Sequence, residues 1–150
     1  MAEIRGCLFP DELLYDEELN LWFRRIDPLT FEVGITPFGL ALSGEVYMFN
    51  PKPDGREIEL GRAFALIEVA KTILPVRVPF AAIVSSSNST VTQSPGLIAR
   101  DPYTSWLARL SIASEVGLDR LISIEGLHAR ALELMDAQGF VSLESYLNKR

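Results

Sequence analysis

The chain has 150 residues, is 48% hydrophobic and 23% charged, and carries a formal net charge of −6 at pH 7. This balance suits one globular domain with a small appendage, and the negative charge argues against a general nucleic-acid surface. The lone cysteine, Cys7, excludes an internal disulfide and a cysteine-based metal site. No apolar run is long enough to span a membrane and the N-terminus lacks an apolar signal core, so the expected compartment is the cytoplasm.

The first part of the chain is predicted to form short elements separated by turns. Residues 10–14 favour a short helical turn, because a capping aspartate follows a proline there. Residues 21–26 and 30–36 are predicted as two strands, and the second alternates apolar with polar side chains. A proline-containing turn at residues 27–29 joins them.

A short helix is predicted for residues 36–44, where Thr36 caps the start, a proline takes the first helical position and Gly44 ends it. Residues 44–49 are predicted as the next strand. A cluster of proline, asparagine, aspartate and glycine at residues 50–55 indicates a turn.

Further strands are predicted at residues 81–85 and 106–112, with a polar loop over residues 85–103 between them. Short strands broken by turns about every ten residues are typical of a sandwich or a flattened barrel. The predicted fold class is therefore mainly β.

Two runs of β-branched and apolar residues within residues 62–79 predict a hairpin with Lys71 at or beside its tip. No Gly, Asn or Asp marks the turn, so this prediction rests on the two runs alone. Pro75 removes a backbone donor from the second arm and predicts an edge strand. A lysine in a turn is most often simply solvated, but the chain has only three lysines, and Glu68 stands three residues before Lys71 in an otherwise apolar run.

Residues 113–150 have a different pattern. From Ser123 onward, apolar residues recur at helical spacing, and Gly139 is expected to end this helix. Ser142 is expected to cap a last short helix. The lone histidine, His128, is interpreted as a structural residue, because one histidine without a cysteine cluster makes no metal site.

An ordered set of motifs resembles the H protein of the glycine cleavage system. The resemblance covers roughly residues 12–112, and Tyr15 and Trp22 are similar to that family's first strand segment. The motifs, in order, are Val33-Gly34-Ile35-Thr36, Gly44-Glu45-Val46, Ala65-Leu66-Ile67-Glu68-Val69-Ala70-Lys71, Val78-Pro79, Asp101-Pro102-Tyr103 and Trp106-Leu107.

The resemblance implies a lipoyl/biotinyl-type flattened β-barrel, or hybrid-motif sandwich, over residues 1–112, with a helical extension over 113–150 packed on it. It implies that the amine of Lys71 is joined covalently to lipoic acid and that Glu68 is part of what the attaching enzyme recognises. The protein would then be a carrier rather than an enzyme, because lipoamide is a group carrier that the protein holds and presents. Its partners would be a lipoate ligase or a lipoyl synthase system, together with the enzymes that load and unload the arm.

Some positions depart from the family pattern. Asn20 stands where the family usually has a histidine before Trp22, and Ala82 replaces a glycine eleven residues after Lys71. A branch of H-like proteins serves lipoate-dependent sulfur oxidation beside a heterodisulfide-reductase-like complex, and the N-terminal part of the chain is similar to that branch. The favoured cargo is therefore sulfur, and the alternative is an aminomethyl group in a genuine glycine cleavage H protein.

Other classes of protein remain as alternatives. An unmodified interaction or lipoate-transfer module is suggested by Ala82. A hydrolase is suggested only by scattered serines, and no triad or carboxylate pair accompanies them. A biotin carrier also presents a lysine on a hairpin, but it usually has methionines beside the lysine, where this chain has Ala70 and Thr72.

Overall fold

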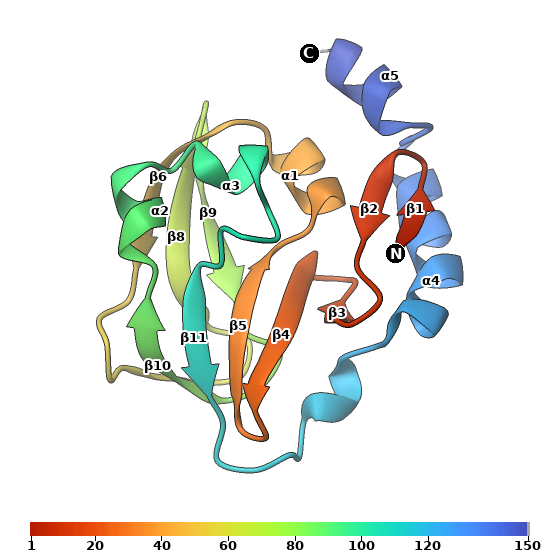
Figure 1. The fold of residues 1–150 in the computed structure, drawn as a ribbon. Coiled ribbons are helices and arrows are strands. Elements are labelled where there is room, and N and C mark those ends of the chain that lie inside the picture. The colour runs from red at the N-terminus through yellow and green to blue at the C-terminus, as the bar shows by residue number, and fades with distance from the viewer. Residues whose placement is uncertain (150) are drawn as a thin grey trace.

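The strands carry buried side chains on one face, so each sheet has an apolar face that must be covered. In the computed structural model, which describes residues 1–149, two antiparallel sheets cover each other in this way (Figure 1). The larger sheet joins, in spatial order, β3 (Leu14–Asp16), β4 (Leu21–Asp27), β5 (Thr30–Ile35), β11 (Ala108–Ser111), β10 (Ala82–Ser87) and β7 (Glu57–Ile58). The smaller sheet joins β6 (Val46–Pro51), β8 (Ala63–Val69) and β9 (Thr72–Arg77).

The core between the sheets is aromatic at its centre. The rings of Phe23 and Phe31, from neighbouring strands of the larger sheet, lie 6.2 Å apart at their centroids, and Phe80 packs 5.6 Å from Phe23. Phe49 and Phe64 contribute the smaller sheet's side of the same buried cluster. The prediction of a mainly β fold built from short strands is confirmed.

Short helices complete the chain at one side and one end of the sandwich (Figure 1). They are α1 (Pro37–Ser43), α2 (Ser89–Gln93), α3 (Leu97–Arg100), the 3₁₀ turn η1 (Leu118–Arg120), α4 (Ile124–Ala137) and α5 (Leu143–Asn148). Thr36 caps α1 as predicted, since its Oγ1 accepts a hydrogen bond of 3.2 Å from the Gly39 N–H. Gly44 ends the helix with a φ of 88°.

A second buried cluster joins the two ends of the chain. An N-terminal hairpin of β1 (Ala2–Ile4) and β2 (Cys7–Phe9) lies beside α4 (Figure 1). Arg5, at the turn of that hairpin, donates a 2.8 Å hydrogen bond to the Phe140 carbonyl and forms an ion pair with Asp136. The Leu143 N–H donates in turn to the Arg5 carbonyl at 2.8 Å. The segment that follows α4 is therefore fixed to the N-terminal hairpin.

Several local predictions were wrong. Residues 10–14 contain no helical turn: a turn at 11–12 leads into β3, and the Tyr15 hydroxyl donates to the Pro10 carbonyl at 2.6 Å. The predicted loop over 85–103 contains the end of β10 and the helices α2 and α3. These short helices depend on distant contacts, such as the 2.9 Å hydrogen bond from Asn88 Nδ2 to the Trp106 carbonyl.

The C-terminal helices begin and end largely as predicted. Ser142 caps α5, because its Oγ accepts a 3.1 Å hydrogen bond from the Ser145 N–H. Gly139, with a φ of 64°, follows the end of α4. Ser123 occupies the N-cap position of α4, but its side chain makes no capping bond to the helix backbone. The domain boundary expected at residue 112 stays a prediction.

Close packing of Trp22 on Gly34 yields a testable prediction. A Cβ added at Gly34 would lie 2.4 Å from the indole ring of Trp22, which is fully buried. We therefore expect Gly34→Ala to lower the free energy of unfolding by about 1–3 kcal/mol, because the ring has to shift within a packed core. Urea denaturation measures this change. Gly96→Ala is the matched control, since nothing lies within 4 Å of the added methyl there. Equal stability of the two variants would contradict the prediction.

Candidate functional site

The candidate site is the end of the β8–β9 hairpin. Val69 pairs with Thr72, so Ala70 and Lys71 form a two-residue turn, and the predicted hairpin with Lys71 at its tip is confirmed. Neither turn residue has a positive φ, which excludes the primed turn types that need Gly, Asn or Asp. A turn whose residues both have negative φ does not require Gly, Asn or Asp, which explains why none of these residues marks the turn in the sequence.

Lys71 is an exposed side chain without a partner. Among residues 1–149, none forms a hydrogen bond or an ion pair with its amine. β9 is an edge strand of the smaller sheet, as Pro75 predicted, so the hairpin stands at the side of the sandwich. A free amine at a tight turn is open to covalent modification by another enzyme.

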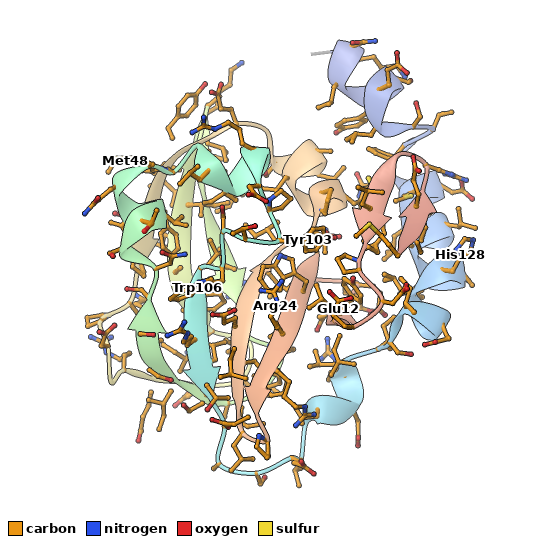
Figure 2. The ribbon with its side chains drawn as sticks, in the orientation of Figure 1. Glu12, Arg24, Met48, Tyr103, Trp106 and His128 are labelled. Carbon is orange, nitrogen blue, oxygen red and sulfur yellow. The ribbon has the colours of Figure 1, made fainter. Side chains whose placement is uncertain are left out.

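Glu68 lies on the outer face of the smaller sheet. Met48, Glu68 and Ile73 are directly opposite one another on β6, β8 and β9, so their side chains share one face. Met48 is 48% exposed and Ile73 is 54% exposed, which identifies this face as the solvent-facing one. Figure 2 shows Met48 at the outer side of the sandwich. Glu68 is thus a half-buried carboxylate between two exposed apolar side chains.

A cavity of about 260 Å³ lies on the β9 side of the hairpin. Its walls are mostly apolar and include Leu19, Leu21, Ile67, Leu74 and Pro75. Leu74 stands three residues from Lys71, which is about 10 Å along a strand.

Charged groups at the edge of this cavity are already engaged. Glu18 forms ion pairs with Arg120 at 3.7 Å and with Arg130 at 3.3 Å. Arg77 donates a 3.0 Å hydrogen bond to the Gly61 carbonyl. Asn20 also lines the cavity and adopts a φ of 58°, a left-handed conformation that asparagine tolerates well. A chain that enters this cavity therefore meets apolar walls, a carboxylate held in ion pairs and a guanidinium bonded to a backbone carbonyl.

A larger cavity, of about 570 Å³, lies on the β6 side of the same hairpin. It is bounded by α1, α3 and α5 together with the first residues of β6. Most of its lining is apolar, and Arg100 and Glu45 are the charged residues in it. No sequence pattern indicated either cavity, because their walls come from segments far apart in the chain.

Among residues 1–149, no three His, Cys, Asp or Glu side chains gather so that they could hold a metal ion. His128 is exposed on α4, on the opposite side of the molecule from α2 (Figures 1 and 2). None of the helices in the described part has both the length and the apolar character needed to cross a bilayer.

The buried titratable groups with displaced pKa values lie away from Lys71. Burial raises the pKa of Tyr15, of Tyr103 and of the Asp16 carboxyl. Asp16 accepts backbone hydrogen bonds from Leu19 and Glu18 at 3.0 and 3.1 Å, so it holds the β3–β4 turn in place. Tyr15 and Tyr103 pack in the second cluster, and Asp16 fixes the turn beside it.

Comparison with known proteins gives one consistent result. The family model for the glycine cleavage H-protein matches residues 13–133. The glycine cleavage system H protein 2 of Aquifex aeolicus is 34% identical over 115 residues, covering 76% of this chain and 71% of its own length. The glycine cleavage system H protein of Nocardia farcinica is 32% identical over 132 residues, covering 87% of this chain and 92% of its own length.

A solved structure shares the fold. The crystal structure of a glycine cleavage system H protein from Mycobacterium marinum superposes with a TM-score of 0.67 at 18% sequence identity. The match covers 81% of this chain and 98% of that one. The predicted lipoyl-type sandwich is thereby confirmed.

Burial of Cys7 predicts that its thiol does not react in the folded protein. Its side chain is fully buried, and burial raises the pKa of the thiol to about 11. At pH 8 on the order of 0.1% of this thiol is ionised in the folded chain, so we expect no reaction of the native, unmodified protein with an aromatic disulfide reagent. One thiol per chain should react in strong guanidinium. Rapid reaction of the native protein would contradict the prediction.

Proposed function

The chain belongs to the glycine cleavage H-protein family, whose members are carriers with lipoate joined covalently to a lysine, and we propose that Lys71 is the attachment residue here. The observation that carries this proposal is the exposed, unpartnered amine of Lys71 on a two-residue turn. Lys52 and Lys149, the other two lysines, lie on no such turn between paired strands.

The geometry suits a carrier. Lipoate, when bound, supplies a dithiol that holds a group between two enzymes, and the chain has to present it. An amide at Lys71 removes the lysine charge and leaves an arm that reaches on the order of 14 Å, at about 1.5 Å per bond. The paired strands β8 and β9 give this arm a rigid base. Tethering raises the effective concentration of the dithiol for any enzyme that docks on the hairpin.

We also propose that the enzyme that attaches lipoate recognises Glu68. It lies on the open face of the hairpin, three residues before Lys71, and no described residue pairs with its carboxylate. Met48 and Ile73 on either side exclude some water from it, which strengthens an ion pair with a basic residue of a partner. The partner in this role is a lipoate ligase or a lipoyl synthase system.

For the cargo, we propose sulfur, with a heterodisulfide-reductase-like complex as the partner. The cavity on the β9 side is mostly apolar, and its one carboxylate, Glu18, is held by two arginines. A cationic aminomethyl group would need a free carboxylate beside the arm to offset the cost of burying its charge. Sulfur atoms bound to the arm are polarisable and can be buried among apolar side chains without such a partner. Aquifex aeolicus by itself has relatives numbered 2, 3 and 5, so one organism can hold several members of the family, and these can serve separate tasks.

The alternative is a glycine cleavage H protein that carries an aminomethyl group between the enzymes of that system. The names of the relatives favour it. An unmodified interaction or lipoate-transfer module is the remaining alternative. Ala82, the residue that suggested it, is buried at the start of β10 in the larger sheet.

Modification of Lys71 is tested by intact mass and peptide mapping of protein from its native host. We expect one lipoyl group on Lys71, none on the Lys71→Arg variant, and unchanged modification of Lys52→Arg. Glu68→Gln should fold normally but be lipoylated at least about tenfold more slowly, as loss of one charge-assisted hydrogen bond predicts. A bare Lys71 in native material would overturn the carrier proposal for this residue.

The cargo is tested with lipoylated protein whose arm is reduced for the sulfur donor and oxidised to the disulfide for the glycine reaction, because transfer of an aminomethyl group from glycine consumes the disulfide. We expect the mass of the arm to rise by whole sulfur atoms when the protein is incubated with a persulfide donor and the host's heterodisulfide-reductase-like complex. Incubation with glycine and the host's glycine-decarboxylating enzyme should leave the arm unchanged. If an aminomethyl adduct forms on this protein as fast as on a glycine cleavage H protein, the sulfur proposal is wrong and the protein serves glycine cleavage.

A further inference from the structure

A cluster of cations lies at the end of the β8–β9 hairpin that is away from its tip. A cavity of about 430 Å³ opens there, and four cations line it, which we call the basic cluster: Lys52, Arg56, Arg62 and Arg77. Two carboxylates, of Glu57 and Glu59, also line the cavity, so its residues have a formal net charge of +2 in a chain whose net charge is −6. An acidic chain thus gathers positive charge at one place on its surface.

The cations of the basic cluster are not used for ion pairs within the chain. No carboxylate of residues 1–149 pairs with any of them, and Arg77 makes the cluster's one side-chain hydrogen bond, to the Gly61 carbonyl. Apart from Arg100, every other arginine of the described chain is paired with a carboxylate, namely Arg5, Arg24, Arg25, Arg109, Arg120 and Arg130. The charges of the basic cluster are therefore left for a partner outside the chain.

The basic cluster and the hairpin tip share one face of the smaller sheet. Along β9, the exposed side chains of Ile73, Pro75 and Arg77 alternate with the half-buried Leu74 and the buried Val76. The outer face therefore runs from the tip, past exposed apolar side chains, to the cations.

The lipoyl arm does not reach the basic cluster. β8 runs from Ala63 beside the cluster to Val69 beside the tip, which is on the order of 20 Å. The arm extends about 14 Å from Lys71. Figure 1 shows the tip of β8 and β9 at the upper end of the sandwich and the chain between β6 and β8 running round the lower end. Only a molecule that covers the whole face meets both the tip and the cluster.

We propose that the outer face of the smaller sheet is a docking surface for the enzyme that loads the arm, and that the basic cluster binds an acidic patch on that enzyme. This rests on the proposed function, because it requires an arm on Lys71. Met48 and Ile73, both exposed, supply the apolar centre of the interface. Glu68 near the tip and the cations at the far end give the face opposite charges at its two ends. A partner with complementary charges therefore docks in one orientation, with Lys71 directed toward its active site.

The chemistry of the cavity favours a protein surface over a nucleic acid or an anionic membrane. Phosphate backbones and anionic headgroups present closely spaced charges, which Glu57 and Glu59 in the same cavity repel. The net charge of −6 on the whole chain also opposes adsorption to either of them. Single carboxylates on a protein surface can bind single arginines and stay clear of both glutamates.

The docking surface is tested with full-length protein whose lipoylation has been verified by intact mass. Loading of the arm is measured with the host's heterodisulfide-reductase-like complex and a persulfide donor, and separately with its glycine-decarboxylating enzyme and glycine. With the enzyme that loads the arm, Arg62→Glu should lower kcat/KM about tenfold at an ionic strength of about 0.01 M and leave kcat unchanged. At about 1 M the loss should shrink to less than about twofold, since the Debye length falls from about 30 Å to about 3 Å. Glu59→Gln should raise kcat/KM, because it removes a carboxylate from the same cavity.

Lys149→Glu is the matched control, since it changes the net charge equally at an exposed position just after α5 and should leave kcat/KM unchanged. Arg56→Glu repeats the test at a second exposed cation of the cluster. Equal effects of Arg62→Glu and Lys149→Glu would overturn the docking surface. So would normal loading of both cluster variants combined with loss of binding to phosphatidylglycerol vesicles or to a DNA duplex. Wild-type protein that neither enzyme loads would contradict the proposed function, and the docking surface with it.

Discussion

Burial of one face of the β8–β9 hairpin against the larger sheet is the constraint on which the candidate site depends. Phe64, Ile67 and Val76 belong to the core between the sheets, while Glu68 and Ile73 face water. Because side chains alternate along a strand, a slip of one residue would bury Glu68 and expose Ile67. The register that stabilises the core therefore also sets which side of the hairpin a partner meets and where Lys71 points.

The sequence predicted the parts of this arrangement that depend on local chemistry. The strand β5, the cap of α1 by Thr36 and the position of Lys71 at a tip all follow from neighbouring residues. The alternation predicted for β5 does not divide it into a buried and an exposed face, because Glu32 is buried as well as Phe31 and Val33. The N-terminal hairpin was not predicted, since its turn places Arg5 at a φ of 51° and is held by contacts with α4 and the residues after it. The cavities could not be predicted either, because α3 and α5 are more than forty residues apart in the chain.

The second buried cluster connects the C-terminal helices to the N-terminal hairpin of β1 and β2. α4 packs against β1 and β2, and the backbone bond from Leu143 to Arg5 sets where α5 begins. α5 then reaches α1 and the cavity beside β6. The position of one wall of this cavity is thus determined by residues at the far N-terminus, through packing and the hydrogen bond between Leu143 and Arg5.

A hairpin at the side of a sheet leaves the backbone N–H and C=O groups of its outer strand unpaired. Such an edge can pair with a strand of another copy of the chain, and this leads to aggregation. Pro75 lies within β9, the edge strand, opposite Leu66. Proline is tolerated in a strand where its missing N–H would have faced solvent, so the outward row of donors in β9 is interrupted at this residue. A second copy of the chain that tried to add a strand along β9 would find no backbone donor at this residue.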